Sequence, residues 1–245
     1  MDYFVFSDIH GHGELFDKIM SWLNGRSEPW KCIFLGDACD RMPDGYRIME
    51  TLLNDERFIY LKGNHEDMFV KAARALREYW EAENLTYDKI AANPCAAITD
   101  YSWDRDVDLC LYNGGASTLI DWVKDGKSNL KIINQLDALP EHMELPHDIW
   151  GTLDLSHAGH SKDNSDDMLW SRQHFLEKWT GGRMIHGHTP VRNAKKMACV
   201  DGAHKDTRPL FYNDGTKVCI DTACFSTNMI TLLNLKTFEQ HTFTV

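Results

Sequence analysis

The sequence predicts an α/β fold with partly parallel strands, and two observations support this prediction. First, five short apolar runs each end at a loop rich in Gly, Asp, Asn or His, as expected of buried strands that stop at a tight turn. Second, apolar residues at helical spacing follow the first three runs. Alternating strand and helix units imply parallel pairing. The predicted strands cover residues 3–6, 32–35, 58–61, 152–155 and 183–185.

Three helices are expected after these first strands, because apolar residues recur there at intervals of three or four. The first helix ends near Gly25, the second opens at Pro43, and the third covers residues 66–80. Their inward faces are formed by Leu15, Ile19, Trp22 and Leu23, by Ile48, Met49, Leu52 and Leu53, and by Phe69, Ala72, Ala73 and Leu76.

Residues 81–150 interrupt this rhythm and are predicted to be a helical insertion in a single domain that spans residues 1–245. Two helices are expected near residues 116–124 and 129–137. The chain has 245 residues and 43% apolar content, which is enough for one sizeable core without a second domain. The insertion suits either a packing cap or a lid that selects substrates, and the sequence leaves both readings open.

The loops after the five predicted strands carry six side chains of the kinds that bind metal ions. Ligands at strand ends converge in space when the strands share a sheet. Carboxylate, amide and imidazole donors together suit borderline divalent metals such as Mn, Fe, Co, Ni or Zn. The loops read SDIHG (7–11), GDACDR (36–41), GNHE (63–66), SHAG (156–159) and HGHT (186–189).

Two metal ions about 3.5–4 Å apart need a ligand that touches both, and Asp37, which follows a Gly in a tight turn, suits that role. Asp8 and His10 lie two residues apart, so they share one face of an extended loop and fit the first metal. The second metal would be held by neutral donors, namely Asn64, His157 and His188. A water between two dications becomes acidic, so a hydroxide nucleophile is expected at neutral pH.

The five motifs in this order resemble the phosphoprotein phosphatase branch of the calcineurin-like metallophosphoesterases. The resemblance runs from Asp8 to His188, includes YNGGAST (112–118), and extends to KVCIDTACFSTNMITLLNL (217–235), which is similar to the strand pair that closes the fold of prokaryotic members. It implies two packed mixed β-sheets flanked by helices, a four-layer fold with the metals at one edge. It also implies the same six ligands.

Three further roles follow from the resemblance and from the chemistry of phosphoryl transfer. His65, beside Asn64, is expected to be the general acid that protonates the leaving group. Asp40 would hold that imidazole in its charged, oriented form. Arg41 offers a planar fork for phosphate oxygens, and Arg172 is expected to be a second phosphate-binding arginine because DDMLWSR (166–172) resembles such a segment.

Three positions depart from the family pattern. Lys62 replaces the usual Arg before GNHE, which keeps the charge but loses bidentate geometry. Met42 and Ala223 each replace a usual Gly. These departures bear on substrate preference rather than on hydrolysis.

Two motifs also have structural readings. Asn64 could be the N-cap of the helix that it opens, a role compatible with ligation. The HGHT loop offers two histidines on one face of a strand. The family alignment favours His188 as the ligand and leaves His186 for packing or for support of the ligands.

Composition restricts the partners and the compartment. The net charge of −11 argues against a standing nucleic-acid partner, which would need clustered Lys and Arg. Seven cysteines without a CxxC pair fit a reducing compartment. The chain enters its first strand without a basic leader, and no apolar run approaches 18 residues, so a soluble, cytoplasmic protein without a membrane partner is expected.

The predicted function is metal-dependent hydrolysis of phosphomonoesters, as in the serine/threonine protein phosphatases of prokaryotes and phages, on a phosphorylated protein, peptide or small molecule. The resemblance favours two Mn²⁺ ions, while Fe, Zn²⁺, Ni²⁺ or Co²⁺ suit the same ligands. The alternative is symmetrical hydrolysis of dinucleoside tetraphosphates such as diadenosine tetraphosphate, since those hydrolases share the motifs. A more distant alternative is a metal-holding binding module without turnover.

Overall fold

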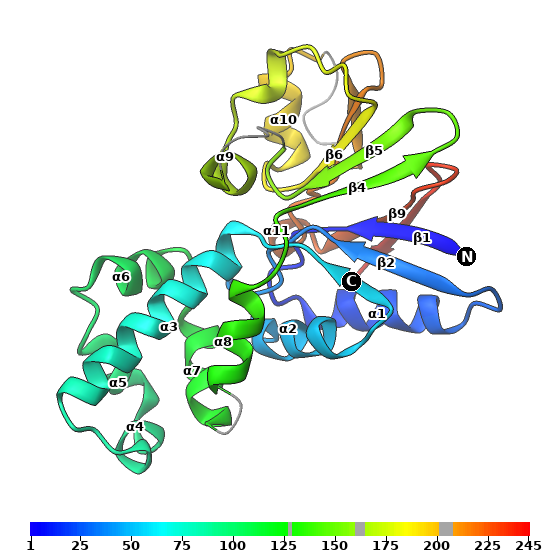
Figure 1. Ribbon diagram of the computed structural model, residues 1–245. Helices are drawn as coiled ribbons and strands as arrows, with labels where there is room; N and C mark the ends of the chain where they lie inside the picture. The colour runs from blue at the N-terminus through cyan, green and yellow to red at the C-terminus, as the bar shows by residue number, and fades with distance from the viewer. Residues whose placement is uncertain (127–128, 160–164, 201–207) are drawn as a thin grey trace.

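The computed structural model describes residues 1–126, 129–159, 165–200 and 208–245, and within them two five-stranded mixed sheets pack face to face (Figure 1). The first sheet has the order β10-β9-β1-β2-β3, and the second has the order β4-β5-β6-β8-β7. The strands are β1 (Asp2–Phe6), β2 (Trp30–Phe34), β3 (Phe58–Tyr60), β4 (His142–His147), β5 (Gly151–Ser156), β6 (Arg183–His186), β7 (Leu210–Tyr212), β8 (Lys217–Cys219), β9 (Met229–Asn234) and β10 (Gln240–Thr244).

Parallel pairing joins three consecutive strands in each sheet. Strands β1, β2 and β3 run parallel, as do β5, β6 and β8, while β9, β10, β4 and β7 are antiparallel additions. This arrangement confirms the predicted α/β fold with two mixed sheets. The five predicted strands correspond to β1, β2, β3, β5 and β6.

The core between the sheets is made of aliphatic residues that point inward from both of them. Because successive side chains of a strand alternate between its two faces, the neighbours of these residues point outward. The buried residues between the sheets are Val5, Ile33, Leu35, Leu61, Leu153, Leu155, Ile185, Val218, Ile220, Leu233 and Leu235.

Helices cover the outer faces of both sheets and complete four layers. Phe4, Phe6 and Phe34 on the outer face of the first sheet pack against α1 and α2, while α10 packs over β7 on the second sheet (Figure 1). The helices are α1 (Gly13–Asn24), α2 (Gly45–Asn54), α3 (Asn64–Ala82), α4 (Tyr87–Ala92), α5 (Pro94–Thr99), α6 (Arg105–Tyr112), α7 (Ala116–Asp125), α8 (Asn129–Asp137), α9 (Ser165–Trp170), a 3₁₀ turn η1 (His174–Leu176), α10 (Val191–Met197) and α11 (Cys224–Thr227).

Helices α3 to α8 form a lobe beside the sheets (Figure 1). The long helix α3 leads into this lobe and packs against α6, α7 and α8. Helices α7 and α8 lie where two helices were expected within the insertion. The helical part ends at Asp137, because residues 142–147 form the edge strand β4 rather than more helix.

The C-terminal segment differs from the expected strand pair. Strand β8 belongs to the second sheet and β9 to the first, so the chain crosses between the sheets through α11 instead of turning back on itself. No helix in the described part of the chain is long and apolar enough to cross a membrane.

Candidate active site

The predicted ligand loops meet at one edge of the two sheets, next to the start of α3. Backbone hydrogen bonds join the first two loops, from the Asp8 N–H to Gly36 O and from the His10 N–H to Asp37 O, each 3.0 Å. The HGHT loop approaches Asp8 so closely that a Cβ on Gly187 would lie 2.1 Å from its carboxylate. The loops are therefore fitted to one another through their main chains.

Four of the six predicted ligands have left-handed backbone conformations. The φ angles are 53° at Asp8, 45° at His10, 63° at Asp37 and 61° at His188. Such conformations cost non-glycine residues about 1–3 kcal/mol each, and they persist only where the surrounding structure enforces them. Backbone strain is thus concentrated at these loops.

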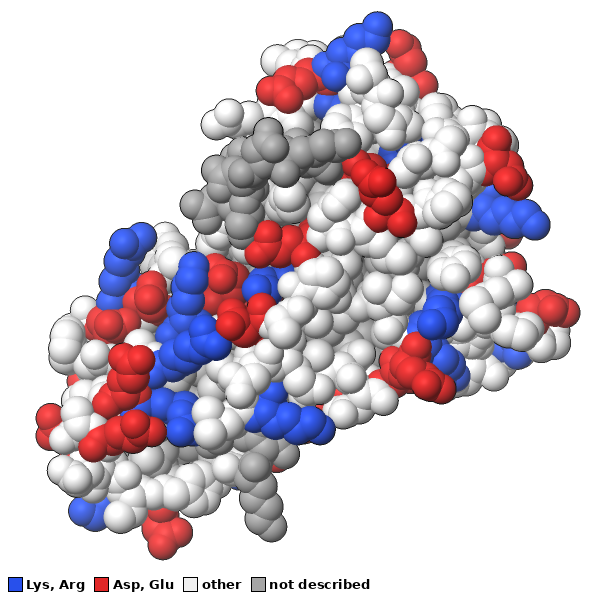
Figure 2. Space-filling view, viewed as in Figure 1, with Lys and Arg blue, Asp and Glu red and all other residues white. Residues whose placement is uncertain are grey.

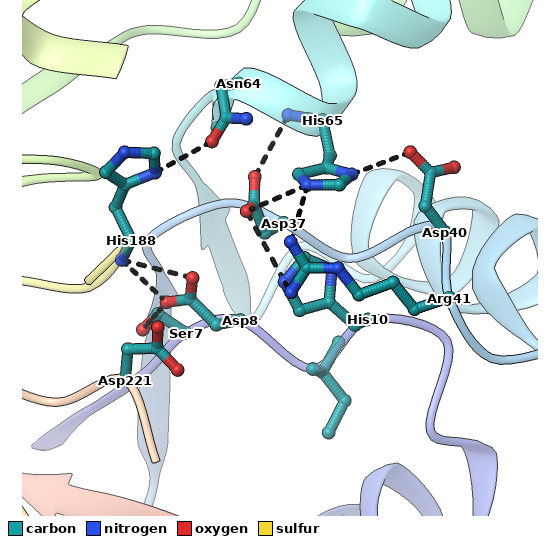
Figure 3. A network of polar contacts seen from close by, with 12 residues as sticks. Ser7, Asp8, His10, Asp37, Asp40, Arg41, Asn64, His65, His188 and Asp221 are labelled. Carbon is teal, nitrogen blue, oxygen red and sulfur yellow. Dashed lines mark hydrogen bonds and ion pairs between the residues drawn. The ribbon is translucent and has the colours of Figure 1, made fainter. Parts of the chain in front are cut away.

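One group of donor atoms converges on the Asn64 side chain. Its carbonyl oxygen lies 2.9 Å from His157 Nε2 and 2.9 Å from His188 Nδ1, and His157 Nε2 lies 3.4 Å from an oxygen of Asp37 (Figure 3 labels Asn64, His188 and Asp37). All four side chains are buried. Asp37, His157 and His188 form one of the groups that could hold a metal ion.

A second group lies on the other side of Asp37. His10 Nε2 is 3.6 Å and His65 Nε2 is 3.8 Å from the other oxygen of Asp37. These three residues could hold a second ion. The carboxylate of Asp8 accepts the His188 N–H at 3.1 Å and also the Ser7 hydroxyl, and the nearby charge of Asp37 contributes to raising its pKa. The structure therefore places Asp37 between two groups of imidazoles, with His10 and His65 on this side and Asp8 linked to the HGHT loop.

Hydrogen bonds orient two of these rings as ligands require. His10 Nδ1 donates to Cys39 O at 3.1 Å, and His157 Nδ1 donates to Leu35 O at 2.8 Å. Each bond fixes the proton on Nδ1 and leaves the Nε2 lone pair facing Asp37, which is the usual arrangement of metal-binding histidines. Burial, reinforced at His10 by the charge of His65, lowers the pKa of both rings and keeps them neutral.

The carboxylates of the site differ in their electrostatic surroundings. Burial alone would raise the pKa of Asp37, but the surrounding imidazoles, His157 first, hold it far below its usual range. Burial and the neighbouring carboxylates of Asp221 and Asp37 raise the pKa of Asp8. Burial also raises the pKa of Asp221, which lies beside Asp8 in Figure 3, to about 6. Of Asp8, Asp37 and Asp221, Asp37 is the one whose pKa is lowered.

His65 and Asp40 form a close pair. His65 Nδ1 lies 2.7 Å from Asp40 Oδ2, and the other Asp40 oxygen accepts the Thr118 hydroxyl at 2.9 Å. Burial alone would lower the pKa of His65, but the charge of Asp37 and the hydrogen bond to Asp40 raise it above its ordinary value. The ring is thus oriented with Nε2 toward the site.

Arg41 lies over the site, and its two terminal nitrogens lie 2.7 Å from His10 Nε2 and 3.1 Å from His65 Nε2 (Figure 3). Its guanidinium carbon is 4.5 Å from the centre of the Phe225 ring. The backbone of Arg41 is held by Gly114, whose carbonyl accepts its N–H at 3.1 Å. Two residues of the segment YNGGAST thus hold the catalytic candidates in place: Thr118 bonds to Asp40, and Gly114 bonds to the backbone of Arg41.

The second predicted arginine, Arg172, is exposed, and its charge contributes to lowering the pKa values of His157 and His188. It therefore lies near the group at Asn64. Lys62 does not face the site, because its ammonium donates to Asp137 O at the end of α8 at 2.7 Å. His186 is also outside the ligand groups, since its Nε2 lies 2.8 Å from the Tyr212 hydroxyl.

Glu66 has a role that the sequence did not suggest. Its fully buried carboxylate accepts the N–H groups of Asp37 (2.9 Å), Ala38 (2.7 Å) and Gly63 (2.8 Å) and the Tyr60 hydroxyl (2.7 Å). It fastens the loop of Asp37 to the start of α3. The N-cap of α3 is Gly63 and not Asn64, so the Asn64 side chain is free to face the histidines.

The donor set fits divalent metal ions. Ligand atoms bound to one ion at 2.0–2.2 Å lie roughly 3 Å apart, which is close to the separations around Asn64. Imidazole, amide and carboxylate atoms in one buried cluster also match the ligand preferences of borderline metals.

A carboxylate shared by two groups of buried imidazoles, at the strand ends of a two-sheet α/β fold, is the arrangement of a metal-dependent hydrolase. A model of the calcineurin-like phosphoesterase family matches residues 1–220, and the chain belongs to this family, whose members use divalent metal ions. No curated protein sequence matches the chain.

Solved structures with the same fold have different substrates in their names. A candidate diadenosine tetraphosphatase is 13% identical with a TM-score of 0.59, over 99% of this chain and 93% of that one. A cold-active protein tyrosine phosphatase has a TM-score of 0.56 at 13% identity, over 98% and 78%. A protein serine/threonine phosphatase from Saccharomyces cerevisiae with similarity to human phosphatase PP5 has a TM-score of 0.52 at 13% identity, over 100% and 80%. At this identity the likenesses establish the fold alone.

Proposed function

We propose that this protein is a metal-dependent phosphomonoester hydrolase that acts on phosphoserine and phosphothreonine in proteins. The observation that carries the proposal is the placement of the His65–Asp40 pair and Arg41 directly beside Asp37. A proton donor and an anion-binding fork then lie within reach of one bound phosphate.

The two ions would be held by six residues, with Asp37 common to both sites. The first site would consist of Asp8, His10 and Asp37, and the second of Asp37, Asn64, His157 and His188. Mn²⁺ is the proposed metal on family resemblance. When bound, the ions would supply Lewis acidity and lower the pKa of a water toward neutrality.

The side chains of the protein supply the remaining chemistry. Arg41 and Arg172 bind the equatorial phosphate oxygens through charged N–H groups. Arg41 must first turn away from the two rings that it now contacts, because His65 Nε2 has to face the departing oxygen of the substrate. His65 carries a proton on Nε2 and donates it to the departing serine or threonine oxygen, while Asp40 stabilises the imidazolium.

The second candidate is symmetrical hydrolysis of dinucleoside tetraphosphates. One observation favours it: the Trp170 ring centre lies 6.3 Å from that of His188 and offers an aromatic surface beside the site. The same catalytic residues would serve both reactions.

The substrate assignment is tested by comparing kcat/KM in Mn²⁺ for a phosphothreonine peptide and for diadenosine tetraphosphate. Protein with Asp37→Asn serves as the blank. A preference of about a hundredfold corresponds to roughly 2.7 kcal/mol of differential transition-state binding. A preference for the dinucleotide would replace the proposed substrate. Bound metal without hydrolysis of even an aryl phosphate would instead favour a binding module.

We also infer a reducing, cytoplasmic setting, which is supported by the absence of disulfides. All seven cysteines are free, and five of them are buried. Burial raises the pKa of the buried thiols, as at Cys39 and Cys224, so they stay protonated and unreactive.

A further inference from the structure

A pocket of about 420 Å³ opens between α3, α6 and α9, outside the residues assigned to the reaction. Its apolar lining is formed by Met68, Leu109 and Trp170. Met68 is buried, whereas Leu109 is 37% exposed. The pocket therefore presents an apolar surface to solvent within the range of volumes typical of ligand sites.

Two residues that line the pocket, Met68 and Trp170, lie close to residues of the candidate active site. Met68 lies four residues after Asn64 on α3, so the two side chains share one face of the helix, one turn apart. On the opposite wall, the Trp170 ring lies 6.3 Å from the His188 ring. A group next to the scissile phosphate therefore has this pocket within its reach.

The charged rim of the pocket is balanced in sign. Lys71 is paired with Asp67 at 2.7 Å, and the neighbours Arg105 and Asp106 contribute one charge of each sign. Figure 2 shows the same mixture of Lys and Arg with Asp and Glu over the helical lobe. A chain of phosphates would need cations without anionic partners, so this rim does not favour a tetraphosphate.

We propose that this pocket binds an apolar side chain close in sequence to the phosphoserine or phosphothreonine of a protein substrate. The proposal rests on the proposed function and adds a sequence preference to it. A neutral rim around an apolar floor suits an uncharged side chain such as Leu or Phe. The face of α6 that carries Leu109 continues to Tyr112, which is 88% exposed, so a bound peptide has an apolar surface to follow.

The preference is measured with phosphothreonine peptides that differ at one position at a time on either side of the phosphothreonine. Each position carries Leu, Phe, Gly, Asp or Lys. We expect kcat/KM for Leu or Phe at one position to exceed that for Gly, Asp or Lys by about tenfold or more. Equal hydrolysis of all peptides by the unaltered protein would overturn the proposal while leaving the proposed function intact.

Two variants, Leu109→Asp and Leu109→Gln, test whether this pocket causes the sequence preference. Both should reduce the ratio of kcat/KM for the Leu peptide over the Gly peptide to about one. The matched control is Leu130→Asp on α8, where the leucine is 50% exposed and outside the pocket. This control should keep the ratio, and thermal melts check that all three variants fold.

Two other outcomes separate this proposal from the function on which it rests. Hydrolysis of an aryl phosphate but of no phosphopeptide would remove the protein substrate, and the proposal with it. If diadenosine tetraphosphate were the better substrate and Leu109→Asp slowed its hydrolysis, a nucleoside would be the occupant and the apolar peptide side chain would be ruled out.

Discussion

Two groups of buried histidines, each with one member from the HGHT loop, differ in whether a carboxylate lies among them. His10, His65, His157 and His188 surround Asp37. The second group consists of His174 and His186, whose ring centres are 4.7 Å apart. His186 contacts the Tyr212 hydroxyl, and the backbone carbonyl of His174 accepts a hydrogen bond from Lys217.

Their pKa values show the effect of that carboxylate. Burial lowers the pKa of His174 to about 2 and that of His186 to about 4. Asp37 and Asp40 instead raise the pKa of His65 although it is equally buried. Burial therefore keeps a histidine neutral, and the two carboxylates beside His65 offset that effect, whereas His10, His157 and His188 keep lowered pKa values beside Asp37.

The largest expected effect comes from removing that carboxylate. Asp37→Asn should lower turnover by more than about 10³-fold, because neutralising the shared ligand weakens the attraction for both ions. Metal analysis of the purified variant should show a parallel loss of bound divalent ion. The control is Asp88→Asn, at an exposed aspartate on α4. Full metal content together with normal turnover would refute the bridging role.

The next effect concerns the only histidine of the first group whose pKa is raised. His65→Asn should lower turnover of a phosphothreonine peptide by about 10²–10⁴-fold, the usual contribution of a general acid. The loss should be smaller with p-nitrophenyl phosphate, whose leaving group needs no proton, and metal content should stay near that of the unaltered protein. His147→Asn on β4 is the control. Equal losses on both substrates would contradict the acid role.

The smallest expected effect tests the second histidine group through stability. The folded-state pKa of His186 is about 4, below the ordinary value of about 6.5, so the unfolded chain binds more protons between these values. The free energy of unfolding should therefore fall by at most about 3 kcal/mol as the pH decreases from 6.5 to 4. Above pH 6.5 His186 is neutral in both the folded and the unfolded chain, so this loss of stability is absent.

Urea unfolding at several pH values measures this dependence. His186→Phe should flatten the profile, although it also removes the hydrogen bond to Tyr212 and so lowers stability at neutral pH. His174→Phe should flatten it further. Profiles that keep their slope in both variants would mean that other groups take up the protons.

The loops could be predicted from the sequence because residue type and chain geometry agree there. A short apolar run followed by Asp, His or Asn with Gly identifies both a buried strand and its polar end, as at β1 and β2. The edge strand β4 was missed, because its residues become a strand through pairing with β5 rather than through an apolar pattern of their own. The short strand β7 and the terminal β10 depend on their partners in the same way.

Contacts between distant segments could not be predicted either. The ammonium of Lys62 binds a carbonyl at the end of α8, and only the packing of that helix against α3 places the carbonyl there. Glu66 accepts hydrogen bonds from the N–H groups of Asp37 and Ala38, 29 and 28 residues upstream, and from that of Gly63, three residues upstream. Its motif says nothing about these partners. The hydrogen bond from the His188 N–H to the Asp8 carboxylate likewise joins residues 180 positions apart.

The left-handed φ angles at Asp8, His10, Asp37 and His188 mean that the main chain, as much as the side chains, aims the ligands. Transplanting the six ligands onto another scaffold would therefore require copying the backbone angles of each loop. On loops with ordinary right-handed backbone angles, the same carboxylates and imidazoles would point away from one another. A search that compares residue types alone would not detect this difference. A faithful template for this centre is a set of dihedral angles joined to a set of residues.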